Sequence, residues 1–164
     1  MTQNFASTTT VGRFYNPGYE YLMGIYWMKE AQVVLSSDDT RYYLPAKAVL
    51  RACLAIDGYV NGMGRKVDPE WETINEETTP VKERLARINN NLEQPFNLNQ
   101  VIWKDVILLF DLQEQLSRFE LESIYGMPEA EVPEIFKEIE QKYPIRMIHA
   151  ITEEAIQFLL TITG

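Results

Sequence analysis

The sequence has little of the residue types that most often carry catalysis. It holds one cysteine, Cys53, and one histidine, His149, among 164 residues. A single cysteine excludes an intramolecular disulfide. Because Cys53 lies in the apolar run AVLRACLAI, we expect it to be a small buried hydrophobic residue. A ferritin-like di-metal site needs two Glu-x-x-His pairs, so the single histidine excludes that class.

Signatures of metal, nucleotide and nucleophile sites are also missing. His149 and Glu153 are four residues apart, but two ligands without a third make a weak metal site, and a helix-surface pair is the preferred interpretation. The segment GYVNGMG lacks the strand–turn–helix context and the lysine of a phosphate loop. No serine or cysteine lies in a recognisable nucleophile turn. The sequence therefore predicts no metal and no cofactor.

Basic residues are few relative to acidic ones. The chain has 15 Lys and Arg against 24 Asp and Glu, a net charge of -9 at pH 7. This charge repels phosphate and disfavours RNA as a partner unless basic side chains form a local patch. We favour neutralisation of neighbouring glutamates as the role of the basic residues that are candidates for such a patch. These are Arg84, Arg87, Arg118, Lys142 and Arg146.

The sequence also lacks long hydrophobic runs. No segment approaches the roughly 20 apolar residues of a membrane span. The N-terminal MTQNFASTTT has neither the basic start nor the apolar core of a signal peptide. The expected location is cytoplasmic, with no membrane partner.

Helical periodicity organises most of the chain. Residues 1–18 have no apolar period and are predicted to form a flexible arm, and residues 19–164 are predicted to form one domain. Helical spacing is found at about 19–34, 44–60, 80–89, 100–123 and from 144 to the end, with a short helix at 134–141. Strand signals are weak. The predicted fold is an all-α, up-and-down bundle of five or six helices.

The predicted helix 44–60 is apolar on nearly all sides and is therefore expected to be central. Its last glycines are expected to end it. Residues 61–80 mix Gly, Pro and charge without a period, which predicts a functional or mobile loop. Four aromatic residues follow helical stripes and are expected in the core rather than on a base-stacking surface. These are Tyr26, Trp27, Trp103 and Phe110.

Two stretches resemble the HEPN-like superfamily of helical bundles. PAKAVLRACLAIDGYVNG, residues 45–62, is similar to the second HEPN helix, which ends in an acidic residue followed by Tyr or Asn. The equivalents here are Asp57, Tyr59 and Asn61. IWKDVILLFDLQEQLSRF, residues 102–119, resembles the later helix that carries an Arg-x4-6-His motif. The resemblance covers about residues 19–163, and in catalytic relatives it implies a metal-independent RNase site assembled across a homodimer.

Gln113 and Arg118 stand where the resemblance places the catalytic Arg and His, with Glu114 in place of the usual Asn. Histidine can accept a proton near neutral pH, whereas arginine stays protonated. The resemblance therefore implies a non-catalytic interaction module, with a second copy of the chain or another protein as its partner. Because Gln113 shares a helical stripe with Leu109 and Leu116, we expect its amide to be buried and hydrogen-bonded.

Two alternatives stay open. A rebuilt RNase site would use His149 together with Arg146 or Arg118. A small-molecule or peptide binder would use a pocket between the predicted helices 19–34, 44–60 and 100–123. Tyr26, Trp27, Asp57 and Tyr59 are expected to gather in that pocket.

Overall fold

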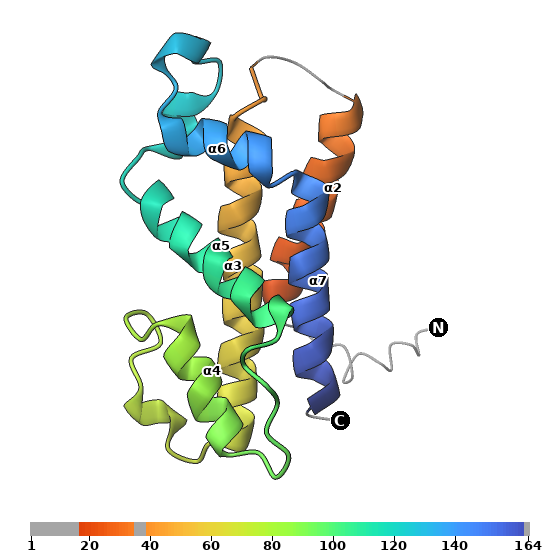
Figure 1. Ribbon diagram of the computed structural model, residues 1–164, viewed down its shortest axis with the longest axis vertical. Helices are drawn as coiled ribbons and strands as arrows, with labels where there is room; N and C mark the ends of the chain where they lie inside the picture. The colour runs from red at the N-terminus through yellow and green to blue at the C-terminus, as the bar shows by residue number, and fades with distance from the viewer. Residues whose placement is uncertain (1–16, 35–38, 163–164) are drawn as a thin grey trace.

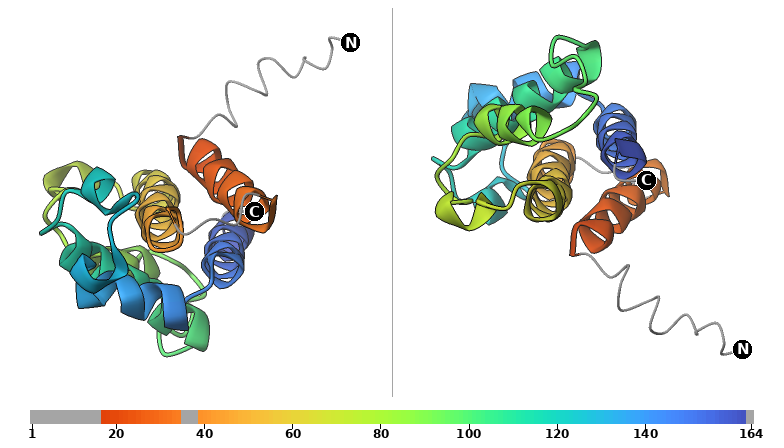
Figure 2. Two further views of the ribbon diagram at one scale, coloured as in Figure 1. Left: turned by 90° about the horizontal axis from the view of Figure 1, so that it is seen from above. Right: turned by 90° about the horizontal axis from the view of Figure 1, so that it is seen from below.

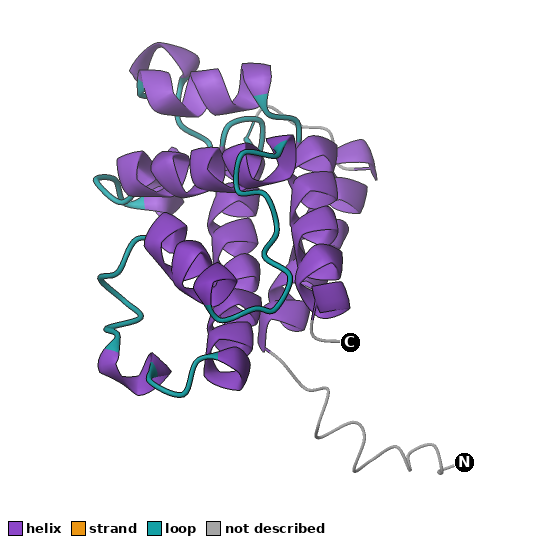
Figure 3. Cartoon of the chain, turned by 60° about the horizontal axis from the view of Figure 1, so that its bottom comes forward, coloured by secondary structure: helices purple, strands orange, loops and turns teal. Residues whose placement is uncertain are grey.

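The computed structural model describes residues 17–34 and 39–162, and this part of the chain is helical without strands (Figure 3). The prediction of an all-α helical bundle is confirmed. The α-helices in these residues are α2 (Pro17–Val34), α3 (Tyr43–Val67), α4 (Val81–Asn90), α5 (Val101–Leu116), α6 (Glu134–Lys142) and α7 (Ile145–Ile162). Three short 3-10 helices connect them: η1 (Trp71–Thr73), η2 (Leu121–Ile124) and η3 (Glu129–Glu131).

α3 is the central helix, as its composition predicts (Figure 1). It packs against α2, α4, α5, α6 and α7. Seen along the long axis of the molecule, α2 and α7 lie on one side of α3, and α4 and α5 lie on the other (Figure 2). The fully buried Ala48, Ala52 and Ala55 let neighbouring helices approach α3 closely. α6 lies across one end of the bundle (Figure 1).

The aromatic residues divide between core and surface. Trp103 is fully buried, and its ring centroid lies 5.2 Å from that of Phe158 on α7. Tyr26 and Phe110 are half-buried. The core prediction is wrong for Trp27, which is 63% exposed on α2, because Ile25 occupies the inward position of that helical turn.

α3 extends seven residues, about two turns, beyond its predicted end at Val60, and its glycines do not end it. The helix continues through Gly58, Gly62 and Gly64 to Val67. At Gly64 the reason is close packing, because a Cβ atom there would lie 2.4 Å from atoms of the Trp71 indole ring. The first part of the predicted 61–80 loop is therefore helix.

α5 ends earlier than predicted, at Leu116 rather than near residue 123. The Ser117 N–H donates to the carbonyl of Gln113, and the Ser117 hydroxyl donates to the carbonyl of Glu114 over 2.6 Å. This hydroxyl hydrogen bond competes with continuation of the helix. Arg118 consequently lies in the turn after α5.

Near the N-terminus, α2 begins at Pro17, two residues before the predicted start of the domain. Residues 1–16 of the predicted arm lie outside the described residues. Within the described ranges, no helix is both long and apolar enough to span a membrane.

Candidate functional site

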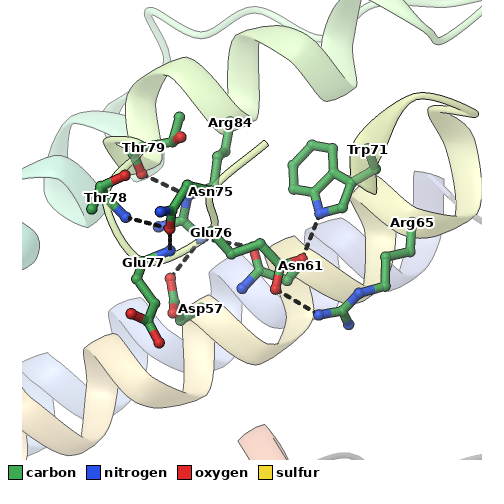
Figure 4. Close-up of polar contacts among 10 residues, drawn as sticks. All are labelled: Asp57, Asn61, Arg65, Trp71, Asn75, Glu76, Glu77, Thr78, Thr79 and Arg84. Atoms are coloured by element: carbon green, nitrogen blue, oxygen red, sulfur yellow. Dashed lines mark hydrogen bonds and ion pairs between the residues drawn. The ribbon is translucent and has the colours of Figure 1, made fainter. Parts of the chain in front are cut away.

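Residues 68–80, here called the strap, connect α3 to α4 and are tied to both helices (Figure 4). Glu76 is the central tie: its carboxylate accepts hydrogen bonds of 2.6 Å from Arg65 of α3 and from the Trp71 indole N–H. Asp68 is paired with Arg87 of α4. The hydrogen bond from Arg87, followed by that from the Glu70 N–H, holds the pKa of Asp68 below its ordinary value. Side-chain hydrogen bonds and ion pairs therefore hold the strap against α3 and α4.

A buried arginine in the first turn of α4, Arg84, binds the end of the strap. Arg84 of α4 has a side chain that is 4% exposed, and its Nη1 lies 2.7 Å from both Asp57 Oδ1 and Asn61 Oδ1 of α3. Its Nε donates to the carbonyl of Thr79 over 3.0 Å. A buried guanidinium requires such partners, because an unpaired buried charge is costly. Arg84 thereby joins α3, the strap and α4.

A cavity of about 680 Å³, here called the groove, opens between α3, the strap, the start of α4 and α5. Its volume lies in the range typical of ligand-binding clefts. Its lining residues are Cys53, Leu54, Asp57, Glu76, Glu77, Thr78, Thr79, Pro80, Val81, Lys82, Arg84, Ile107, Phe110, Asp111, Gln113 and Glu114.

The groove is acidic, and several of its carboxylates are unpaired. Asp57 is neutralised by Arg84, and Glu76 by Arg65. In contrast, the carboxylates of Glu77, Asp111 and Glu114 make no hydrogen bond or ion pair with any residue that the structure describes. All three are exposed.

Apolar side chains form the rest of the groove surface. Leu54 is 43% exposed although it belongs to the central helix, and Ile107 and Phe110 of α5 are half-buried. Beneath them, Cys53 is fully buried and its thiol donates to the carbonyl of Leu109 over 3.3 Å. Burial, followed by the charge of Asp57, raises the pKa of the Cys53 thiol well above its ordinary value. Cys53 therefore remains a protonated structural residue.

Some predicted binding residues meet at the groove and others do not. Asp57, Gln113 and Glu114 line it, and Asn61 lies directly behind it as a partner of Arg84. Tyr59 is half-buried and does not line it. The expected burial of Gln113 is wrong: the side chain is half-exposed, because Leu112 takes the inward position in the last turn of α5.

The three candidate catalytic residues lie outside the groove. Arg118 is exposed in the turn after α5. Arg146 is exposed at the start of α7, and His149, one turn further on, lies beside Tyr26 of α2 with ring centroids 6.1 Å apart. Burial, followed by the charge of Lys29, lowers the pKa of His149 despite the opposing charge of Glu153. The imidazole is thus neutral at pH 7 and faces α2.

The pocket expected from the sequence differs from the observed groove. Only Asp57 of the four residues expected to gather lines the groove, because Tyr26 and Trp27 belong to α2, on the other side of α3 (Figure 2). The strap supplies the wall that was expected from the predicted helix 19–34. Among the described residues, no group of three or more His, Cys, Asp or Glu side chains is placed to hold a metal ion.

Arg84, Glu76 and Glu77 belong to the site, and the sequence pattern does not predict them as site residues. The clue to Arg84 was present, since its amphipathic helix begins immediately after the strap and places the arginine beside Val81 and Leu85 on the buried face. No pattern in the strap itself indicates which of its four glutamates is paired.

The sequence matches no protein-family model, and comparisons with curated proteins and with solved structures return no match.

Proposed function

We propose that this protein is a non-catalytic HEPN-like interaction module that works as a homodimer and binds a partner in the groove. The observation that carries the proposal is the separation of the candidate catalytic side chains from the groove. Arg118, Arg146 and His149 all lie outside its lining. The groove consequently offers binding surfaces but no imidazole to move a proton at neutral pH.

The position of Gln113 supports the same proposal. In the resemblance to HEPN-like proteins, Gln113 and Arg118 correspond to the catalytic pair on one helix. Here α5 ends at Leu116, so the two residues do not share a helical face. An amide at position 113 can orient a ligand by hydrogen bonding, but it cannot act as an acid or a base.

The homodimer is proposed from the resemblance and from the exposure of Trp27 on α2. Large aromatic side chains at the surface are enriched in protein interfaces. The proposed compartment is the cytoplasm, which suits a chain whose only cysteine is a free thiol.

Cleavage of a labelled, structured RNA tests the non-catalytic claim. The proposal predicts intact RNA with the wild-type protein and with His149→Ala alike. Cleavage by the wild-type protein that His149→Ala abolishes would establish the rebuilt RNase instead. Light scattering tests the homodimer, with a mass of twice 19.1 kDa expected.

A further inference from the structure

We propose that the groove binds a short segment of a partner protein that combines a basic side chain with an adjacent apolar one. This inference rests on the proposed function, since it names the chemistry of the partner that the interaction module takes.

Charge complementarity points to the basic side chain. The unpaired carboxylates stand on two walls of the groove, Glu77 on the strap and Asp111 and Glu114 on α5. Asp111 and Glu114 are three residues apart on one helix, which makes their side chains neighbours. An arginine or lysine entering between the walls finds carboxylates on both sides.

The basic residues of the lining do not neutralise these unpaired carboxylates. The lining holds five acidic and two basic side chains, and one of the two, Arg84, is already bound to Asp57 and Asn61. The other, Lys82, is an exposed side chain on the second residue of α4. The groove therefore keeps an excess of negative charge for a ligand, and it repels RNA.

Apolar contacts point to the second side chain. Leu54 of α3 and Ile107 and Phe110 of α5 give the same groove an accessible apolar surface. Burial of this surface favours a ligand with an aliphatic or aromatic group next to its positive charge. A simple polycation can pair with the carboxylates but leaves the apolar surface exposed to water. A peptide segment can pair with the carboxylates and also cover the apolar surface.

The wall formed by the strap is fixed before a partner arrives. Glu76 joins the strap to Arg65 of α3, and Arg84 of α4 binds the Thr79 carbonyl of the strap. Within the strap, the Trp71 indole N–H donates to Glu76. Figure 4 shows these bonds converging on residues 75–79 from both helices. A preformed wall reduces the conformational entropy that binding would otherwise cost.

Fluorescence anisotropy of a labelled peptide of alternating arginine and leucine tests the proposal on the full chain. The groove variant is Glu77→Gln/Asp111→Asn/Glu114→Gln, and it is expected to bind the peptide at least tenfold more weakly than the wild-type protein. The matched control is Glu93→Gln/Glu131→Gln/Glu154→Gln, which removes the same charge from exposed side chains outside the groove. The control is expected to bind within about twofold of wild type, because net charge alone acts weakly at physiological salt. Equal weakening by both triple variants would overturn the proposal, since binding would then follow net charge.

Two further experiments test whether the apolar surface of the groove contributes to peptide binding. Leu54→Ser is expected to weaken binding at least fivefold, whereas Leu160→Ser, an exposed leucine of α7, should leave it unchanged. Spermine is expected to compete only weakly with the peptide. Competition by spermine as strong as by unlabelled peptide, with no effect of Leu54→Ser, would assign the groove to a small polycation and overturn a protein segment as the occupant. Absence of peptide binding by an RNA-inert dimer would overturn this inference alone, whereas RNA cleavage would overturn the proposed function.

Discussion

Arg84 of α4 donates a hydrogen bond from Nη1 to Oδ1 of Asn61 on α3 over 2.7 Å, and both side chains are buried. Arg84→Met would leave the Asn61 amide unsatisfied in the interior and release the Thr79 carbonyl of the strap. We expect a loss of about 3 kcal/mol in the free energy of unfolding, measured with urea. The control Arg146→Met, at an exposed arginine, should change it by less than about 0.5 kcal/mol. Equal effects of the two variants would show that the Arg84 network is not structural.

The two glycines near the end of α3 should respond in opposite directions to alanine. Gly64→Ala would place a Cβ atom 2.4 Å from atoms of the Trp71 ring, so the strap must shift. We expect it to destabilise the fold by about 1 to 3 kcal/mol. Gly62→Ala, on the exposed face of the same helix, should stabilise by about 0.5 to 1 kcal/mol through helix propensity. Thermal unfolding of both variants checks this, and a stable Gly64→Ala protein would contradict the packing of Trp71 on α3.

The pairing of Asp68 with Arg87 makes stability depend on acidic pH. Because the folded-state pKa of Asp68 is lowered below 3.8, its ionised form contributes stability above that pH, and the contribution is lost as the pH falls through the folded-state pKa. Urea midpoints of wild type and Asp68→Asn should therefore differ at pH 7 and converge towards pH 3. A difference that stays constant between these pH values would show that Asp68 has an ordinary pKa.

Trp27 provides a test of the proposed homodimer. Its side chain is 63% exposed on α2, and Trp27→Glu would place a charge on that surface without disturbing the core. We expect the mass from light scattering to fall from twice 19.1 kDa towards that of one chain. Tyr125→Glu, at a residue that is 55% exposed in the turn after η2, should keep the mass of the wild-type protein. Dissociation by both variants, or by neither, would contradict a dimer through α2.

The helical pattern of the sequence was sufficient to predict the class of fold and the central place of α3. Apolar residues recur at helical spacing, and a helix rich in alanine such as α3 can be surrounded on all sides. Its end could not be predicted in the same way. Gly64 is required by a tryptophan seven residues later, and that is a tertiary contact which no local propensity expresses.

The candidate site was only partly predictable for a similar reason. Asp57, Gln113 and Glu114 were found because they belong to helices with clear periods. Glu77 was missed because the strap has no period, and its place in the groove depends on the ties made by Glu76 and Arg84. At Gln113 the buried face of α5 differs from the predicted one. Leu109 and Leu116 fit a stripe through Gln113, whereas the buried face includes Leu112.

Mapping of the bound peptide by two-dimensional NMR of the isotope-labelled protein tests most directly the claim that this is an interaction module acting through the groove. Titration with the arginine–leucine peptide should shift signals of Leu54, Glu77, Ile107, Asp111 and Glu114, which line the groove from α3, the strap and α5. Signals of Glu131 and Glu154, acidic residues outside the groove, should stay in place. Shifts that are spread evenly over the acidic surface, or that centre on α2, would contradict it.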